Sequence, residues 1–154
     1  MNPKETHKGI LAYVVYMPLV FFFLILLGFA ASLYADVPLS RNTNFLSGIG
    51  FFSVFSGTVL VYFAQKAVGK IRLEDPADVN FYEGPYRGMR HPTYVGLFLL
   101  SFGLSLILNS AVALAVALLQ FLITRFFVIR EEKLLIDRYG SRFLEYKKHI
   151  PRIF

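Results

Sequence analysis

The chain of 154 residues is long enough for one domain, and 56% of its residues are hydrophobic while only 17% are charged. This balance excludes an ordinary soluble domain and indicates that lipid surrounds most of the chain. The sequence contains no cysteine, which excludes disulfide bonds and cysteine nucleophiles, and we predict no metal site. The net charge of +6 comes from residues beside apolar segments, so we interpret it as membrane anchoring and expect no nucleic-acid partner.

Three charge-free stretches organise the chain; they cover residues 9–35, 42–65 and 92–124. The first two each contain the roughly 20 apolar residues that cross a bilayer as a helix, and they predict spans near 10–33 and 45–65. The first stretch follows Lys4 and Lys8, as a signal peptide would. It is too long for the apolar core of a signal peptide, so we expect a retained span.

The third charge-free stretch is too long for a single crossing. Its 33 residues would form a helix of about 50 Å, whereas the hydrocarbon core is about 30 Å thick. Asn109 and Ser110 are a clearly polar pair near its centre, so we predict a tight hairpin with spans near 92–108 and 111–129. The predicted fold class is therefore all-α and integral to the membrane, with about four transmembrane helices in a single domain over 1–154.

Apolar residues recur at spacings of three and four after the hairpin. This pattern predicts a C-terminal amphipathic helix over 131–150, interrupted near Gly140, that lies along the membrane surface. Basic residues are concentrated in the N-terminal tail, in the loop 66–91 and after residue 125, whereas the loop 34–44 carries only Arg41. By the positive-inside rule, we predict that both termini and the loop 66–91 of this multi-pass protein are cytoplasmic.

The plausible chemistry falls in two polar segments, which the predicted hairpin returns to the same membrane face. In the first, Arg90 and His91 precede a helix whose start Pro92 favours, and exposed N–H groups at a helix start suit a carboxylate. In the second, Glu131 and Glu132 are acids able to accept hydrogen bonds from an ammonium group or a ribose. The two segments cover residues 84–96 and 130–152.

Plainer interpretations of these residues stay open. Glu131 and Glu132, followed by Lys133, also fit a solvated helix end, and Arg90 and His91 also fit contacts with lipid phosphates. Tyrosines near a membrane surface are typical of an interfacial aromatic belt. The chain has no GxGxxG, P-loop, HExxH or GxSxG motif, so any cofactor site is built by the membrane fold itself.

In their order and separation, the two segments resemble motifs of the isoprenylcysteine carboxyl methyltransferase family and its phospholipid methyltransferase relatives. The matching residues are Gly84-Pro85-Tyr86, Arg90-His91-Pro92-Thr93-Tyr94-Val95-Gly96, Glu131-Glu132, Leu135, Tyr139-Gly140 and Tyr146 through Ile150-Pro151. The resemblance implies a membrane methyltransferase that uses S-adenosylmethionine. It further implies a lipidic or small apolar acceptor, such as a prenylcysteine-like carboxylate or a phospholipid amine.

The resemblance also implies roles for individual residues. It places the cofactor contacts at Tyr86, Arg90, His91, Pro92, Thr93, Tyr94, Glu131 and Glu132. Relatives that methylate prenylcysteine carboxylates have an arginine where this chain has Phe127, so Arg125 or Arg130 is the candidate substitute, and the predicted catalytic residues are Arg125, Arg130 and Glu131. A sterol-reductase-like enzyme that uses NADPH and a non-catalytic membrane scaffold are the alternatives.

Overall fold

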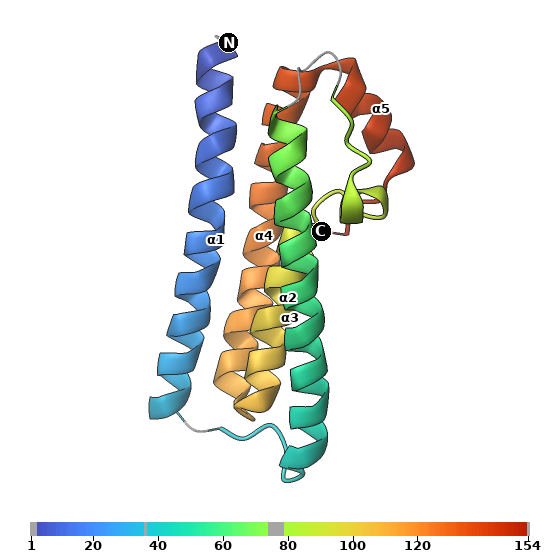
Figure 1. Ribbon diagram of the computed structural model, residues 1–154. Coiled ribbons are helices and arrows are strands. Elements are labelled where there is room, and N and C mark those ends of the chain that lie inside the picture. Colours follow the sequence, from blue (N-terminus) through green and yellow to red (C-terminus); the bar gives the residue numbers. More distant parts are fainter. Residues whose placement is uncertain (1–2, 36, 74–78, 154) are drawn as a thin grey trace.

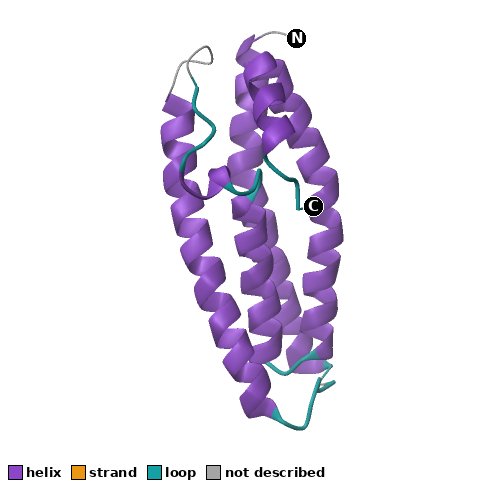
Figure 2. Ribbon diagram, turned by 90° about the vertical axis from the view of Figure 1, so that its right-hand side faces the viewer, coloured by secondary structure: helices purple, strands orange, loops and turns teal. Residues whose placement is uncertain are grey.

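The computed structural model describes residues 3–35, 37–73 and 79–153, with side chains from Leu19 onward. Within these residues Figure 2 shows helices and loops and no strand. The elements are α1 (Pro3–Tyr34), α2 (Thr43–Leu73), the short 3-10 helix η1 (Gly84–Arg87), α3 (Pro92–Ile107), α4 (Ala111–Tyr139) and α5 (Ser141–His149). The four long helices run side by side, and α5 lies beside the end of α2 that is farther from the α1–α2 connection (Figure 1). The predicted all-α fold class is confirmed.

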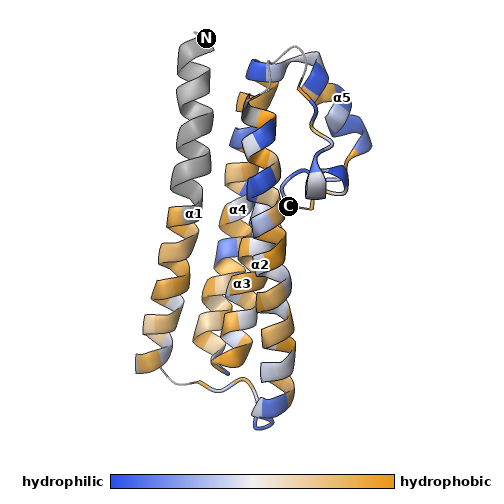
Figure 3. Ribbon diagram, viewed as in Figure 1, coloured by the Kyte–Doolittle hydropathy of each residue, from blue (hydrophilic) through white to orange (hydrophobic). Residues whose placement is uncertain are grey.

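Apolar residues dominate the long helices at the end where α1 connects to α2. Two stretches, Thr43–Ile71 and Ala111–Tyr139, are long and apolar enough to cross a membrane, and two shorter apolar helices cover Leu19–Tyr34 and Pro92–Ile107. Hydrophilic residues gather at the opposite end, around α5 (Figure 3). This distribution agrees with a membrane protein whose polar groups are collected at one end of the bundle.

The predicted hairpin turns at Asn109, between α3 and α4. Asn109 has a φ of 49°, a left-handed conformation that asparagine tolerates better than most residues. Its side-chain oxygen accepts a hydrogen bond from the Ser40 N–H at 3.0 Å, and its amide donates to the Ser40 carbonyl at 2.9 Å. Because Ser40 lies in the α1–α2 connection, the hairpin reaches the far end of the bundle and does not turn back halfway (Figure 1).

Small residues allow α2 and α3 to pack at close range. Gly50 of α2 lies against Gly103 of α3, and a Cβ built on Gly50 would stand 2.7 Å from the Gly103 carbonyl oxygen. Gly57 meets Gly96 in the same way, with a hypothetical Cβ 2.7 Å from the Gly96 carbonyl oxygen. Such close approach is the usual basis of helix association in lipid, where helices gain little from the hydrophobic effect.

Two helix ends differ from the sequence prediction. The second helix continues to Leu73, although residues 66–73 were predicted as loop. The fourth continues to Tyr139, although a separate helix was predicted from 131. Both extensions follow from composition, because strong helix formers continue beyond each apolar stretch with no proline to interrupt them. The fourth helix stops at Gly140, whose φ of 55° is left-handed.

The amphipathic pattern of α5 is used for packing within the protein. Phe143 and Tyr146 are each 2% exposed and contact Phe81, which precedes η1. Ile71, Val79, Tyr139 and Ile150 complete this apolar cluster. The cluster fixes α5 against the end of α2, and it accounts for the apolar face of α5 without a membrane surface. The predicted surface position of this helix stays a prediction.

The glycine contacts predict a contrast between two positions on α2. Gly57→Ala should lower the free energy of unfolding by about 1–3 kcal/mol, because the new methyl group would collide with the backbone of α3. Gly48→Ala is the matched control, since no atom lies within 4 Å of a Cβ built there. Denaturant unfolding of both variants in detergent measures the difference. Equal stability of the two would show that α2 and α3 are not in close contact.

Candidate active site

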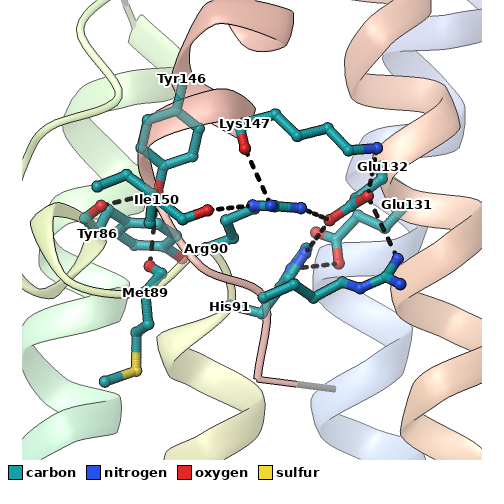
Figure 4. Close-up of polar contacts among 10 residues, drawn as sticks. Tyr86, Met89, Arg90, His91, Glu131, Glu132, Tyr146, Lys147 and Ile150 are labelled. Carbon is teal, nitrogen blue, oxygen red and sulfur yellow. Dashed lines mark hydrogen bonds and ion pairs between the residues drawn. The ribbon is translucent and has the colours of Figure 1, made fainter.

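The two polar segments singled out from the sequence meet at the polar end of the bundle. Arg90 and His91 stand directly before α3, and Glu131 and Glu132 lie on α4. Figure 4 shows the side chains of His91 and Arg90 pointing toward the two acids, with Lys147 of α5 approaching Glu132 from the other side. The hairpin therefore brings together residues about 40 positions apart in the sequence.

Glu132 is the centre of this cluster. Its carboxylate is buried, with a side chain only 4% exposed, and it is surrounded by cationic groups. One oxygen lies 2.9 Å from Nη1 of Arg90 and 3.4 Å from Nε2 of His91. The other oxygen lies 2.9 Å from Nζ of Lys147 and 3.6 Å from Nη1 of Arg152. A buried carboxylate without such partners would be strongly destabilising, so these cations are required for the fold.

Arg90 uses each of its three guanidinium nitrogens within the protein. Besides the bond from Nη1 to Glu132, Nε donates to the Ile150 carbonyl at 2.6 Å and Nη2 donates to the Lys147 carbonyl at 3.0 Å. The last carbonyls of a helix lack partners within the helix, and here one arginine satisfies two at the end of α5. Arg90 thereby ties α5 and α4 to the start of α3.

A tyrosine pair makes a second connection between α5 and η1. The Tyr146 hydroxyl donates to the Tyr86 carbonyl at 2.7 Å and lies 3.5 Å from the Met89 carbonyl. Burial raises the pKa of Tyr146, so its hydroxyl stays protonated and remains a donor. The backbone around Tyr86 is therefore held by α5, and the half-buried Tyr86 side chain lies beside the charged cluster (Figure 4).

Glu131 differs from its neighbour in hydrogen bonding. Its Oε2 atom is buried and has no hydrogen-bond partner. The nearest charged group is Nδ1 of His91, at 3.6 Å, which is beyond hydrogen-bond distance. Buried polar atoms in proteins are nearly always hydrogen-bonded, so this oxygen distinguishes Glu131 from the fully paired Glu132.

His91 stands between the two acids and is itself buried. Burial alone would lower its pKa, but Glu131 and Glu132 outweigh burial and raise the pKa above the ordinary value of 6.5. Its ring also lies 5.9 Å from the ring of Tyr94. The two acids therefore favour the protonated form of the imidazole.

The other predicted site residues are only partly brought together. Pro92 and Tyr94 are buried and Thr93 is half-buried in the first turn of α3, with Tyr94 packed 5.7 Å from the Phe21 ring of α1. Arg125 and Arg130, predicted as catalytic, occupy exposed positions on α4 and take no part in the ion pairs around Glu132. Their predicted contact with substrate stays a prediction.

Two members of the cluster, Lys147 and Arg152, are absent from the predicted set. Both lie in the C-terminal segment, with side chains about one-third exposed and both reaching Glu132. Helical periodicity placed Lys147 on the polar face of a surface helix, and nothing in the local sequence shows that α5 folds back over α4. The apolar cluster around Phe143 and Phe81 brings them there, together with the hydrogen bonds of Arg90 and Tyr146.

The fold and the cluster define a helical membrane protein with a buried charged site at one end of its bundle. Residues 43–142 match the family described as phospholipid methyltransferase. The chain belongs to this family of membrane methyltransferases, and the resemblance predicted from the motifs is confirmed. The chain is also similar to protein-S-isoprenylcysteine O-methyltransferase of Xenopus laevis, with 33% identity over 129 residues. That similarity covers 78% of this chain but 43% of the relative, so the chain spans less than half the length of that protein.

The unequal pairing of the two acids predicts unequal effects on stability. Glu132→Ala should lower the free energy of unfolding by about 3–5 kcal/mol, because it leaves several cations around an empty buried position. Glu131→Ala should cost about 1 kcal/mol, since the Oε2 atom it removes accepts no hydrogen bond. Denaturant unfolding in detergent compares them. A larger loss for Glu131→Ala would contradict the assignment of Glu132 as the structural acid.

His91 predicts a pH dependence of stability. Its pKa is higher in the folded than in the unfolded protein, so its contribution is fully present below 6.5 and is lost as the pH rises through the folded-state pKa. Unfolding measured from about pH 6 to about pH 9 should therefore show stability falling with pH. His91→Gln should flatten this part of the curve. A wild-type curve that rises across the same range would show that the folded pKa is not raised.

Proposed function

We propose that the chain is an S-adenosylmethionine-dependent methyltransferase that acts in the membrane on a lipidic or small apolar acceptor. The observation that supports this most directly is the buried Oε2 atom of Glu131, which has no hydrogen-bond partner beside the charged cluster around Glu132. A structural carboxylate would be paired, as Glu132 is. An unpaired one suits a ligand that brings its own donor.

The residues present fit the proposed cofactor. Glu131 would accept from the ammonium group of its methionine part, while Lys147 and Arg152 keep partly exposed cations nearby for its carboxylate. Tyr86, Pro92, Thr93 and Tyr94 would form the remaining contacts. When bound, S-adenosylmethionine supplies a methyl group already activated by a sulfonium. The site therefore needs no nucleophile of its own, in agreement with the absence of cysteine.

Arg90 and Glu132 have a different proposed role, although the sequence placed both in direct contact with the cofactor. Their hydrogen bonds and ion pairs are made with other parts of the chain. We therefore assign them to holding α3, α4 and α5 in place around the site. The contribution to catalysis is then mainly positioning the acceptor and excluding water, which is sufficient for displacement from an activated donor.

The proton requirements depend on the acceptor. A carboxylate or thiolate acceptor needs no base, whereas a protonated amine must first lose a proton. His91 and Glu131, which lie 3.6 Å apart, are the candidate acceptors for that proton.

An apolar acceptor is supported by the surface of the bundle. A groove of about 580 Å³ runs along α2, with Leu99 as its lining residue from α3; it is lined mostly by apolar residues and reaches Gly84 and Pro85 directly before Tyr86. Its size suits a hydrocarbon chain. The Xenopus relative is named for an isoprenylcysteine acceptor, which is also an apolar chain with a small reactive end. We propose that acceptors enter this groove sideways from the bilayer.

The side of the membrane follows from the distribution of charge. The N-terminal end of α1, the segment before α3 and α5 lie at the same end of the bundle (Figure 1). Apart from Arg41, the lysines and arginines lie in the N-terminal tail, in residues 66–90 and from residue 125 onward, and basic segments remain on the cytoplasmic side. We therefore propose that both termini and the active site are cytoplasmic, where the cofactor is available.

Calorimetric titration of the purified protein in detergent with S-adenosylhomocysteine tests the cofactor. Saturable binding is expected, and Glu131→Gln should weaken it by about tenfold or more, because a charge-assisted hydrogen bond contributes about 1.5–3 kcal/mol. Glu145→Gln is the matched control, since Glu145 is an exposed acid on α5. NADPH is titrated in parallel.

Three results would contradict the proposal. Binding of NADPH alone would favour a reductase, and binding of neither ligand by folded protein would favour a scaffold. Binding that Glu131→Gln leaves unchanged would remove Glu131 from the cofactor site.

A further inference from the structure

The bundle consists of two helix pairs with the candidate site at the boundary between them. The most extensive packing is between α2 and α3, followed by α1 and α4, whereas α3 and α4 share a smaller surface. Arg90 and His91 belong to the first pair and the two acids to the second. The distances between His91 and the two acids therefore depend on the position of the α1–α4 pair along the axis of the α2–α3 pair.

A polar connection crosses this boundary far from the site. The Ser101 hydroxyl of α3 donates to the side-chain oxygen of Gln120 on α4 at 2.5 Å. The Gln120 amide lies 3.5 Å from the Leu97 carbonyl of α3. Gln120 is 1% exposed, in the apolar part of the bundle. A slip of one helix along the other would separate Gln120 from its Ser101 donor and leave its polar side chain in the apolar part of the bundle.

We infer that Ser101 and Gln120 are positioning residues that fix the register of α3 against α4 and thereby hold His91 opposite Glu131 and Glu132. This role rests on the proposed function only because the cluster of His91, Glu131 and Glu132 is taken as the active site.

The course of α4 explains how the connection reaches the site. Gln120, Thr124, Val128 and Glu132 are buried at successive four-residue steps, so they follow one side of the helix. Glu132 lies about 18 Å along the helix from Gln120. A slip of one residue would move the acids by about 1.5 Å relative to His91. The 3.4 Å distance between His91 and Glu132 is already at the limit of a hydrogen bond and would not survive it.

The ionisation of His91 gives a readout that does not require the cofactor. Its charged surroundings are Glu131 and Glu132 of α4 and the adjacent Arg90, with Lys147 and Arg152 reaching it only through Glu132. The Tyr94 ring is a further neighbour, from α3. If the register loosens, His91 loses the acids that raise its pKa and the pKa falls.

The experiment is a pH titration of ¹⁵N-histidine-labelled apo protein in detergent by NMR, with the His91 signal assigned from His91→Gln. Ser101→Ala and Gln120→Leu should each lower the His91 pKa by about half a unit or more. Ser101→Thr keeps the hydroxyl, so the His91 pKa of this variant should stay close to the wild-type value. The matched control is Ser53→Ala. Ser53 donates to the Leu99 carbonyl at 2.9 Å, so its bond joins α2 to α3 within one pair.

The control distinguishes register from general stability. Ser53→Ala should cost stability in the same way but leave the His91 pKa unchanged. An equal shift in Ser53→Ala, or no shift in Ser101→Ala, would overturn the inference. If Gln120→Leu fails to fold, Ser101→Ala and Ser101→Thr decide. A shift in these variants supports the inference even if S-adenosylhomocysteine does not bind, because the measurement uses the apo protein.

Discussion

A buried carboxylate must be balanced by positive charge, and in this chain the balance for Glu132 comes from widely separated segments. Arg90 and His91 precede α3, whereas Lys147 and Arg152 lie in or after α5. Leaving such a charge unpaired costs several kcal/mol, so α3, α4 and α5 are held to one arrangement at this end of the bundle. The site is therefore a consequence of the same charge balance that stabilises the fold.

The adjacent acids Glu131 and Glu132 differ in how completely their oxygens are paired within the chain. Glu132 is fully paired and connects three helices, while Glu131, one position away, keeps a buried oxygen without a partner. Arg90 likewise donates two hydrogen bonds to carbonyl groups at the C-terminal end of α5. Adjacent residues of one motif thus differ in whether their polar atoms are paired within the chain, and the hydrogen bonds of the structure show this difference.

Much of the fold was predictable because a helix needs about 20 apolar residues to cross the hydrocarbon core of a membrane. Charge-free length indicated the long helices, and the polar Asn109-Ser110 pair indicated the hairpin turn. Helix ends were less predictable, because α2 and α4 continue beyond their apolar stretches wherever the residues favour helix. The packing of α5 was also not predictable, because its amphipathic pattern fits a membrane surface and a protein surface equally well. In the structure, Phe143 and Tyr146 of α5 contact Phe81.

The sequence by itself determined the helical membrane class, the two polar motifs and their meeting at one end, because these follow from hydrophobic length and from one polar break. The tertiary structure decided which charges meet. It turned Arg125 and Arg130 outward, brought in Lys147 and Arg152, and left Glu131 unpaired beside His91. Such choices depend on helix rotation and register, which are set by close contacts such as Gly57 against Gly96 and have no signature in local sequence.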